Sequence, residues 1–151
     1  MPHDEFVALV ERLARASDLL RNGGSLLQAV ARRYYLIYAY ATQAAERHGL
    51  SFRRGSDIDD ARRITHQVLP QLIRALYSGQ NVGPVFGGGL GVTRAGRLTD
   101  AQAVRYSDTL QDDRKRADYG FGTTPEPYDV AVMDERLGWA DHLIEDLRTL
   151  L

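Results

Sequence analysis

Residues 25–48 read SLLQAVARRYYLIYAYATQAAERH and form the most apolar part of the chain. Their apolar residues occur at helical spacing and fall on nearly every side of the expected helix. A helix that is apolar almost all round belongs at the centre of a fold rather than on its surface. Ser25 and Gln28 have the spacing of an N-terminal capping box, and Gly49 is the expected C-terminal stop. The sequence therefore predicts a central, buried helix over these residues.

Two further helices are expected on either side of this segment. Residues 4–21 have apolar side chains at helical spacing, and the Asn-Gly-Gly that follows them should end the helix. After a basic loop at residues 52–56, residues 57–77 also carry an apolar stripe. Pro70 lies inside that stripe and is expected to kink or divide the helix, because proline lacks the N–H group that a helix interior uses.

The C-terminal half is predicted to contain a glycine-rich insertion followed by two helices. Residues 78–98 are rich in glycine and are expected to form an irregular loop. Thr99 and Gln102 form a second capping box, which begins a helix that ends in residues 111–120. A loop over residues 120–127 should then lead directly into a last helix.

The expected elements define the fold class. No segment shows the alternation of apolar and polar residues that is typical of a strand. The predicted class is therefore all-α, an up-and-down bundle of four to five helices with a Gly-rich insertion loop at about residues 78–98. The length of 151 residues suits one domain, so we expect a single helical domain over residues 1–151.

Composition excludes several classes of function. The chain contains no cysteine, which rules out disulfides, thiolate zinc sites and cysteine nucleophiles. Its 19 basic and 20 acidic residues nearly balance, so a nucleic acid would have to bind a local patch. The opening residues are acidic where a secretory signal is basic, and no apolar run is long enough to span a membrane. We therefore expect a cytoplasmic protein without membrane contact.

Neither a cofactor nor a metal is expected. The glycine-rich residues 82–96 lack the Gly-Lys-Ser/Thr ending of a phosphate-binding loop, and no strand is predicted before them. The four histidines show no spacing typical of metal ligands, such as His-Glu-x-x-His.

Arg32 and Arg33 are unusual residues for a buried helix. A guanidinium in such a position needs a carboxylate or a solvent-filled groove, and Asp118 is the candidate partner. Four tyrosines follow these arginines and wrap round the helix among aliphatic residues. This spacing favours buried rings with hydroxyls near the surface over a platform on which bases stack.

Residues 111–120 read QDDRKRADYG and end the fourth expected helix. Asp112 with Arg116 and Arg114 with Asp118 are spaced i, i+4, and such pairs stabilise an exposed helix by about 0.2–0.5 kcal/mol each. Asp118 lies in the last turn, where a carboxylate opposes the helix dipole, and this points to a specific cationic partner. The segment is thus either a solvated helix end or a polar cluster around Arg114.

Two motifs, in this order, resemble the HEPN superfamily: AVARRYY at residues 29–35 in an apolar helix, and RKRADY at residues 114–119. The similarity is to its branch of small bacterial and archaeal proteins with an Arg-x-x-Ala-Asp-Tyr signature. It extends from about Ala14 to the C-terminus and is interrupted by the glycine-rich insertion. The resemblance implies an up-and-down helical bundle that often forms a homodimer.

The resemblance also implies a chemistry. Many HEPN proteins are metal-independent ribonucleases, often toxins paired with a minimal nucleotidyltransferase antitoxin or parts of defence systems. Their arginine, followed after four to six residues by a histidine, assists attack by the RNA 2′-hydroxyl on the adjacent phosphate. Arg114 matches that arginine, but Tyr119 stands where the histidine is expected, and tyrosine with its usual pKa near 10 is a poor base. On this basis Arg114 and Tyr119 are the candidate catalytic residues, and the candidate binding residues are Arg32, Arg33, Asp118 and Arg116.

Three functions follow from these observations. The first is a HEPN-type accessory or toxin-like protein that binds RNA or a nucleotidyltransferase partner through Arg114, Asp118 and Tyr119, in a toxin–antitoxin or defence system. The second is an active metal-independent endoribonuclease. The third is a structural interaction module without RNA contact, whose arginines are only ion-paired.

Overall fold

The computed structural model of the chain describes residues 1–60, 65–87, 96–120 and 130–151. Within this part of the chain there are five helices and three short strands. The elements are α1 (His3–Asn22), α2 (Leu26–Arg47), β1 (Ser51–Arg54), β2 (Asp57–Asp60), α3 (Leu69–Ser78), β3 (Val85–Phe86), α4 (Asp100–Tyr119) and α5 (Val130–Arg148). The prediction of a mainly helical protein is confirmed, but the small sheet was not predicted.

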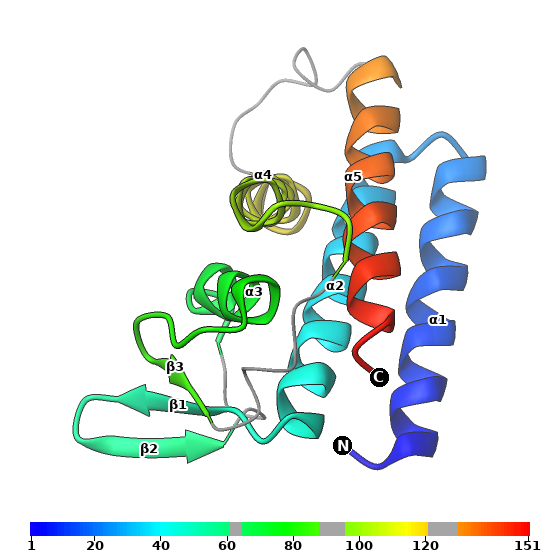
Figure 1. Cartoon of the computed structure of the whole chain (residues 1–151). Coiled ribbons are helices and arrows are strands. Elements are labelled where there is room, and N and C mark those ends of the chain that lie inside the picture. Colours follow the sequence, from blue (N-terminus) through cyan, green and yellow to red (C-terminus); the bar gives the residue numbers. More distant parts are fainter. Residues whose placement is uncertain (61–64, 88–95, 121–129) are drawn as a thin grey trace.

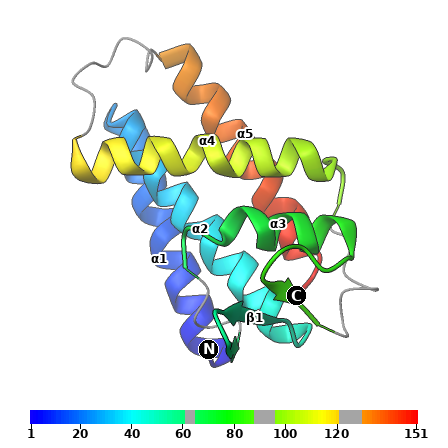
Figure 2. The ribbon, with the colours of Figure 1, turned by 90° about the vertical axis from the view of Figure 1, so that its left-hand side faces the viewer.

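Helix α2 is the central element. Helices α1 and α5 lie along α2 (Figure 1). Helices α3 and α4 cross α2 instead. Both are seen end-on in Figure 1 and lengthwise in Figure 2. Helix α2 contacts all four of the other helices. The arrangement therefore differs from the simple up-and-down bundle that the sequence suggested, since two of the helices run across the other three.

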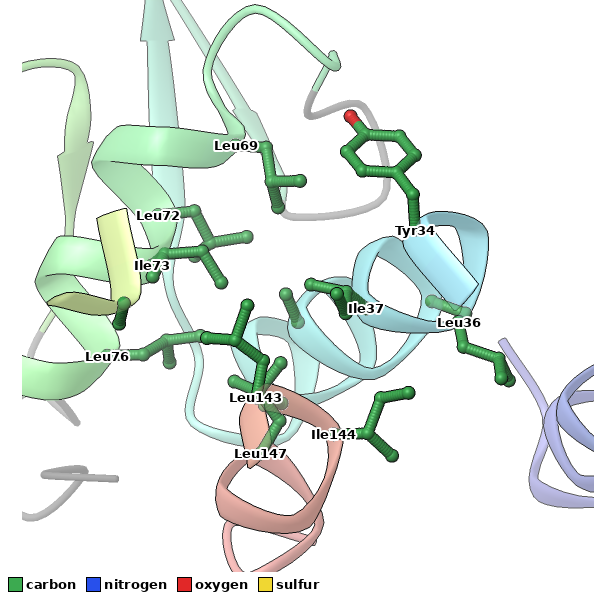
Figure 3. Close-up of a cluster of buried hydrophobic side chains, with 14 of the residues drawn as sticks. Tyr34, Leu36, Ile37, Leu69, Leu72, Ile73, Leu76, Leu143, Ile144 and Leu147 are labelled. Atoms are coloured by element: carbon green, nitrogen blue, oxygen red, sulfur yellow. The ribbon is translucent and has the colours of Figure 1, made fainter. Parts of the chain in front are cut away.

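The apolar core explains why α2 is apolar nearly all round. Figure 3 shows Ile37 of α2 among side chains from α3 and α5, including Leu72 and Leu143, and all three residues are fully buried. Burial of one such side chain stabilises a fold by roughly 1.5–3 kcal/mol. On the other side of α2, the ring of Phe6 in α1 packs edge-on against Tyr40, with the ring centroids 5.4 Å apart. Every side of α2 thus has a neighbour.

Of the two predicted capping boxes, one is present. At the start of α4, the Gln102 backbone N–H donates to Thr99 Oγ1 and the Thr99 N–H donates to Gln102 Oε1, each over 3.1 Å. The box predicted for Ser25 and Gln28 is wrong, because Ser25 makes no side-chain hydrogen bond to the helix. The Gln28 side chain instead donates to the backbone carbonyl of Ala117 over 3.0 Å. It therefore links α2 to the last turn of α4.

The helix predicted over residues 57–77 is wrong in its first part. Strands β1 and β2 form an antiparallel hairpin there, and Gly55 in its turn has a φ of +63°, which glycine adopts without steric cost. Helix α3 begins only at Leu69, with Pro70 in its first turn, where the missing N–H is not needed. Strands of four residues are too short to display a clear alternation, so the sequence pattern did not indicate them. Residues 61–64 lie outside the described part of the chain.

The glycine-rich insertion contributes to the sheet, which the sequence did not predict. Strand β3 pairs with β1, and the strand order is β2-β1-β3. Val85 of β3 is fully buried and belongs to the main core. Residues 88–95 lie outside the described part, as do residues 121–129, so the predicted loop before α5 and the predicted start of that helix are not described. None of the described helices combines the length and apolar character that a membrane-spanning helix needs.

A buried carboxylate fixes the end of the insertion. Asp146 of α5 is 4% exposed and accepts hydrogen bonds from the backbone N–H groups of Arg97 (3.1 Å) and Leu98 (3.2 Å). It also accepts one from the Tyr77 hydroxyl of α3 over 2.7 Å. Burial and the neighbouring Asp146 raise the pKa of that hydroxyl, which therefore stays a donor. These contacts hold α3, α5 and the start of α4 in fixed relation.

Candidate functional site

The crossing of α2 and α4 places Arg114 among aromatic rings. The Arg114 side chain of α4 is only 6% exposed. Its guanidinium carbon lies 5.5 Å from the ring centroid of Tyr34, 5.9 Å from that of Tyr35 and 5.7 Å from that of Tyr119. Rings at such distances attract a cation through their electron-rich faces. Three tyrosines from two helices therefore hold one positive charge.

The polar contacts of Arg114 are long. Its Nη1 lies 3.4 Å from the Tyr119 hydroxyl and 4.0 Å from Asp118 Oδ2. Its Nε is buried and has no hydrogen-bond partner among the described residues. A buried donor without a partner costs free energy, typically about 1–3 kcal/mol. The Nε–H of this guanidinium thus has hydrogen-bonding capacity that the described residues do not use.

Asp118 accepts its short hydrogen bond from a tyrosine rather than from an arginine. The Tyr35 hydroxyl donates to Asp118 Oδ2 over 2.5 Å. Burial raises the pKa of that hydroxyl, and the neighbouring carboxylate raises it further, so the hydroxyl keeps its proton. Arg32, the partner that the sequence suggested for Asp118, has its guanidinium 5.9 Å from the Tyr35 ring centroid. Tyr35 therefore lies between the two groups expected to pair.

His66 joins this site from the segment that precedes α3. Its Nδ1 is 2.8 Å from the Tyr34 hydroxyl, and its ring stacks on Tyr38 with the centroids 4.3 Å apart. The side chain of Gln111 in α4 donates to the His66 backbone carbonyl over 3.3 Å. Burial lowers the pKa of the imidazole, and the nearby Arg114 lowers it further, against an opposing effect of Asp118. His66 is therefore largely neutral at neutral pH.

We call Tyr34, Tyr35, His66, Arg114 and Asp118 the Arg114 cluster. It combines a cation with unused hydrogen-bonding capacity, a neutral imidazole, two protonated tyrosines and a carboxylate. The arginine is suited to an anion, and the imidazole is the one side chain whose usual pKa allows proton transfer near neutral pH. The arrangement can therefore bind a phosphate and exchange a proton beside it.

Three of the predicted binding residues lie outside this cluster, namely Arg32, which lies beside the Tyr35 ring, Arg33 and Arg116. Arg33 forms ion pairs with Asp18 of α1 (2.7 Å) and Asp141 of α5 (3.1 Å), so it joins α2 to the two helices that lie alongside it. Arg116 lies 3.8 Å from the carboxylate of Asp113, which is fully buried in α4.

Asp113 has a second cationic neighbour, Arg136 of α5, at 3.2 Å. Burial raises the pKa of the Asp113 carboxyl, while Arg136 and Arg116 oppose that rise. Asp113, Arg116 and Arg136 therefore link α4 to α5 and are separate from the Arg114 cluster. We assign them a role in packing.

His66 is the residue that the sequence did not indicate. It matches no motif, and it reaches the cluster only because the chain returns from the β1–β2 hairpin to α3 beside Tyr34 and Tyr38. The tyrosines were visible as part of the AVARRYY motif at residues 29–35. Their interpretation as buried rings is confirmed for Tyr34, which is fully buried, but its hydroxyl also binds the imidazole.

No group of three or more His, Asp or Glu side chains in the described part of the chain is placed to hold a metal ion. No family model, curated protein or solved structure matches the chain.

Proposed function

We propose that the protein is a HEPN-type RNA-binding protein that holds a phosphate group of single-stranded RNA at Arg114. The observation that carries this proposal is the state of the guanidinium: it is held by three tyrosine rings, its Nε has no partner among the described residues, and its carboxylate neighbour is 4.0 Å away. A phosphate oxygen supplies the short, charge-assisted hydrogen bonds that this guanidinium lacks. The resemblance of residues 114–119 to the HEPN signature supports RNA as the source of the phosphate.

The surroundings of Arg114 give a route for the phosphate. Tyr119 is 62% exposed, and its hydroxyl lies 3.4 Å from Nη1 of Arg114. A phosphate oxygen that reaches Arg114 from this exposed side would gain an ionic hydrogen bond. Asp118 opposes an anion, but its hydrogen bond from Tyr35 takes up part of its charge.

The resemblance to HEPN proteins also supports a proposal for the biological setting, which is a toxin–antitoxin or defence system. A minimal nucleotidyltransferase is the protein partner that HEPN-type toxin–antitoxin systems suggest, and a homodimer is the expected assembly. In this reading the protein acts as an accessory or toxin-like component of a toxin–antitoxin or defence system, and RNA contact through the Arg114 cluster is its molecular activity.

Binding of a fluorescent single-stranded oligoribonucleotide tests the proposal. We expect Arg114→Ala to weaken binding at least tenfold, and Arg114→Lys to recover only part of it, because lysine cannot form two parallel hydrogen bonds to a phosphate. Arg15→Ala, on the exposed side of α1, is the matched control and should leave the affinity unchanged. Equal affinities of wild type and Arg114→Ala would reject the proposal in favour of a structural module.

A second candidate function, metal-independent cleavage of RNA, is favoured by the presence of His66 in the cluster. A neutral imidazole there can take the proton of the 2′-hydroxyl while O2′ attacks phosphorus and the bond from phosphorus to O5′ breaks. Arg114 would stabilise the charge that develops on the phosphate oxygens. The hydroxyl of Tyr119 would give its proton to the leaving O5′. The products would be a 2′,3′-cyclic phosphate and a 5′-hydroxyl end.

Cleavage is tested with a chelator present, so that no metal-dependent nuclease contributes. Wild type should release a 2′,3′-cyclic phosphate end, and His66→Gln should lose this activity while it keeps RNA affinity. If neither protein cleaves, the function is binding alone. If His66→Gln cleaves as fast as wild type, the assignment of His66 as the base is wrong.

A further inference from the structure

A groove of about 490 Å³ lies between α1 and α2. Its walls are mainly apolar and include Leu9 and Leu13 of α1 and Ala39 of α2. Two tyrosines of α2, Tyr35 and Tyr38, also line it. The groove is larger than a single aromatic ring, and its lining combines aliphatic and aromatic side chains.

The groove and the Arg114 cluster share Tyr35, and a second groove residue, Tyr38, contacts the cluster at His66. Tyr35 lines the groove, while its hydroxyl donates to Asp118 and its ring lies near the Arg114 guanidinium. Tyr38 lines the groove as well, and its ring stacks on His66. One end of the groove therefore adjoins the proposed phosphate site, with Tyr35 in contact with both.

The order of residues along α1 and α2 shows which end of the groove lies beside the Arg114 cluster. The amino group of Met1 pairs with Glu46 at one end of the groove, and Phe6 contacts Tyr40 further along. Helices α1 and α2 run in opposite directions (Figure 1). Of the α1 residues that line the groove, Leu13 is the furthest along the chain, so it belongs to the end formed by Tyr35. Leu13 is therefore the α1 residue whose enlargement would fill the space beside the cluster.

We propose that this end of the groove binds the base of the RNA nucleotide whose phosphate is held at Arg114, an inference that rests on the proposed function. A base is flat, uncharged and apolar on its faces, and stacking on aromatic side chains is how proteins hold bases of single-stranded RNA. Glu5 and Glu46 are the acidic residues of the lining, and they oppose a fatty acid or a second phosphate as occupant. Apolar walls contact any base through its faces, so the site accepts bases with little discrimination.

Removal of a single base is the direct test. Wild-type protein is titrated with a short single-stranded oligoribonucleotide and with versions of it that lack one base at each position in turn. At one position, loss of the base should weaken binding roughly tenfold, which is within the range measured for base–aromatic stacking. If no position matters, the base site is rejected, and this comparison needs no variant of the protein.

A groove-filling variant then locates the base. Leu13→Trp should weaken binding of the intact oligonucleotide to about the level of the abasic one, and should not weaken the abasic one further. Leu19→Trp on the same helix, 70% exposed and outside the groove lining, is the matched control and should bind as wild type. Full affinity of Leu13→Trp for the intact oligonucleotide would overturn the proposal. If Leu13→Trp instead changes only the mass of the assembly, the groove is an interface between copies of the chain.

The two proposals fail in different ways. If Arg114→Ala weakens every oligonucleotide but loss of a base has no effect, the phosphate site stands and the base site is wrong. If Arg114→Ala has no effect on any of them, the RNA-binding function is wrong and the base site falls with it.

Discussion

At the scale of single residues, the site depends on how Arg114 is held. A buried guanidinium needs stabilising neighbours, and here aromatic rings supply most of them while the carboxylate of Asp118 is distant. The sequence indicated Arg114, Asp118 and Tyr119 because they stand in one motif on one helix. The sequence did not indicate His66, because this residue comes from another segment. Spacing within one helix does not show which distant residues approach it.

Loss of the Asp118 carboxylate should have a small effect on stability. The sequence suggested a partly buried ion pair with Arg32, whose loss would cost on the order of 3 kcal/mol. In the structure Asp118 accepts one hydrogen bond from Tyr35 and lies 4.0 Å from Arg114. We therefore expect Asp118→Ala to lower the free energy of unfolding in urea by about 1 kcal/mol. Asp112→Ala, on the exposed side of α4, is the control, and a loss near 3 kcal/mol for Asp118→Ala would show that the cluster holds a stronger ion pair.

His66 should make stability depend on pH. Burial and Arg114 hold its pKa below the usual value of 6.5, so the unfolded chain binds the proton more readily than the folded one. Stability from this residue is therefore complete above pH 6.5 and decreases as the pH falls from there to the lower pKa of the folded state. We expect His66→Gln to show a shallower decrease in unfolding free energy over this interval than wild type. Identical pH profiles of the two proteins would contradict the burial of a neutral imidazole at this position.

At the scale of elements, some local signals were reliable, although the capping box predicted at Ser25 and Gln28 was wrong. Thr99 and Gln102 give α4 a capping box, and apolar spacing located α1 and α2 correctly. The hairpin of β1 and β2 was missed because its strands are four residues long, and Val85 was assigned to a loop because glycines surround it. Its burial comes from pairing with β1, a contact between distant segments that local spacing cannot indicate.

Gly96 should be essential for the junction between the insertion and α4. It has a φ of +48°, and an added Cβ would lie 2.0 Å from Asp146 Oδ1, which accepts the backbone hydrogen bond of Arg97. We expect Gly96→Ala to lower the unfolding free energy by several kcal/mol, beyond the roughly 1–2 kcal/mol of a left-handed alanine. Gly24→Ala is the matched control, because Gly24 also has positive φ but has nothing within 4 Å of its Cβ position. Equal losses in thermal or urea unfolding would show that Asp146 does not fix this junction.

At the scale of the whole molecule, the crossing of helices creates the site. Helix α2 carries the tyrosines, α4 carries Arg114 and Asp118, and the segment before α3 brings His66 to the point where the two helices meet. The sequence predicted α2 as the central helix but described the bundle as up-and-down. The crossing angle of α4 comes from side-chain packing between helices, which apolar spacing along one helix does not specify.

The expected homodimer stays a prediction at this scale. Within one chain, α2 is covered by the other four helices, so its apolar character is satisfied without a second copy. The resemblance to HEPN proteins is then the remaining support for a dimer. Light scattering of the purified protein should give twice the mass of the 16.9 kDa chain. A monomer mass at every concentration tested would remove the dimer and leave the Arg114 cluster unaffected, because all its residues come from one chain.

The salt dependence of RNA affinity is the most direct test of the central claim that Arg114 holds a phosphate. Each phosphate contact of single-stranded nucleic acid contributes roughly 0.7 to the slope of log affinity against log salt concentration. Arg114→Met keeps an apolar side chain among the tyrosine rings but removes the charge. We expect this variant to bind a short oligoribonucleotide more weakly than wild type, with a slope that is smaller in magnitude by about 0.7. Equal affinities and equal slopes would contradict it, because Arg114 would then make no contact with the phosphate.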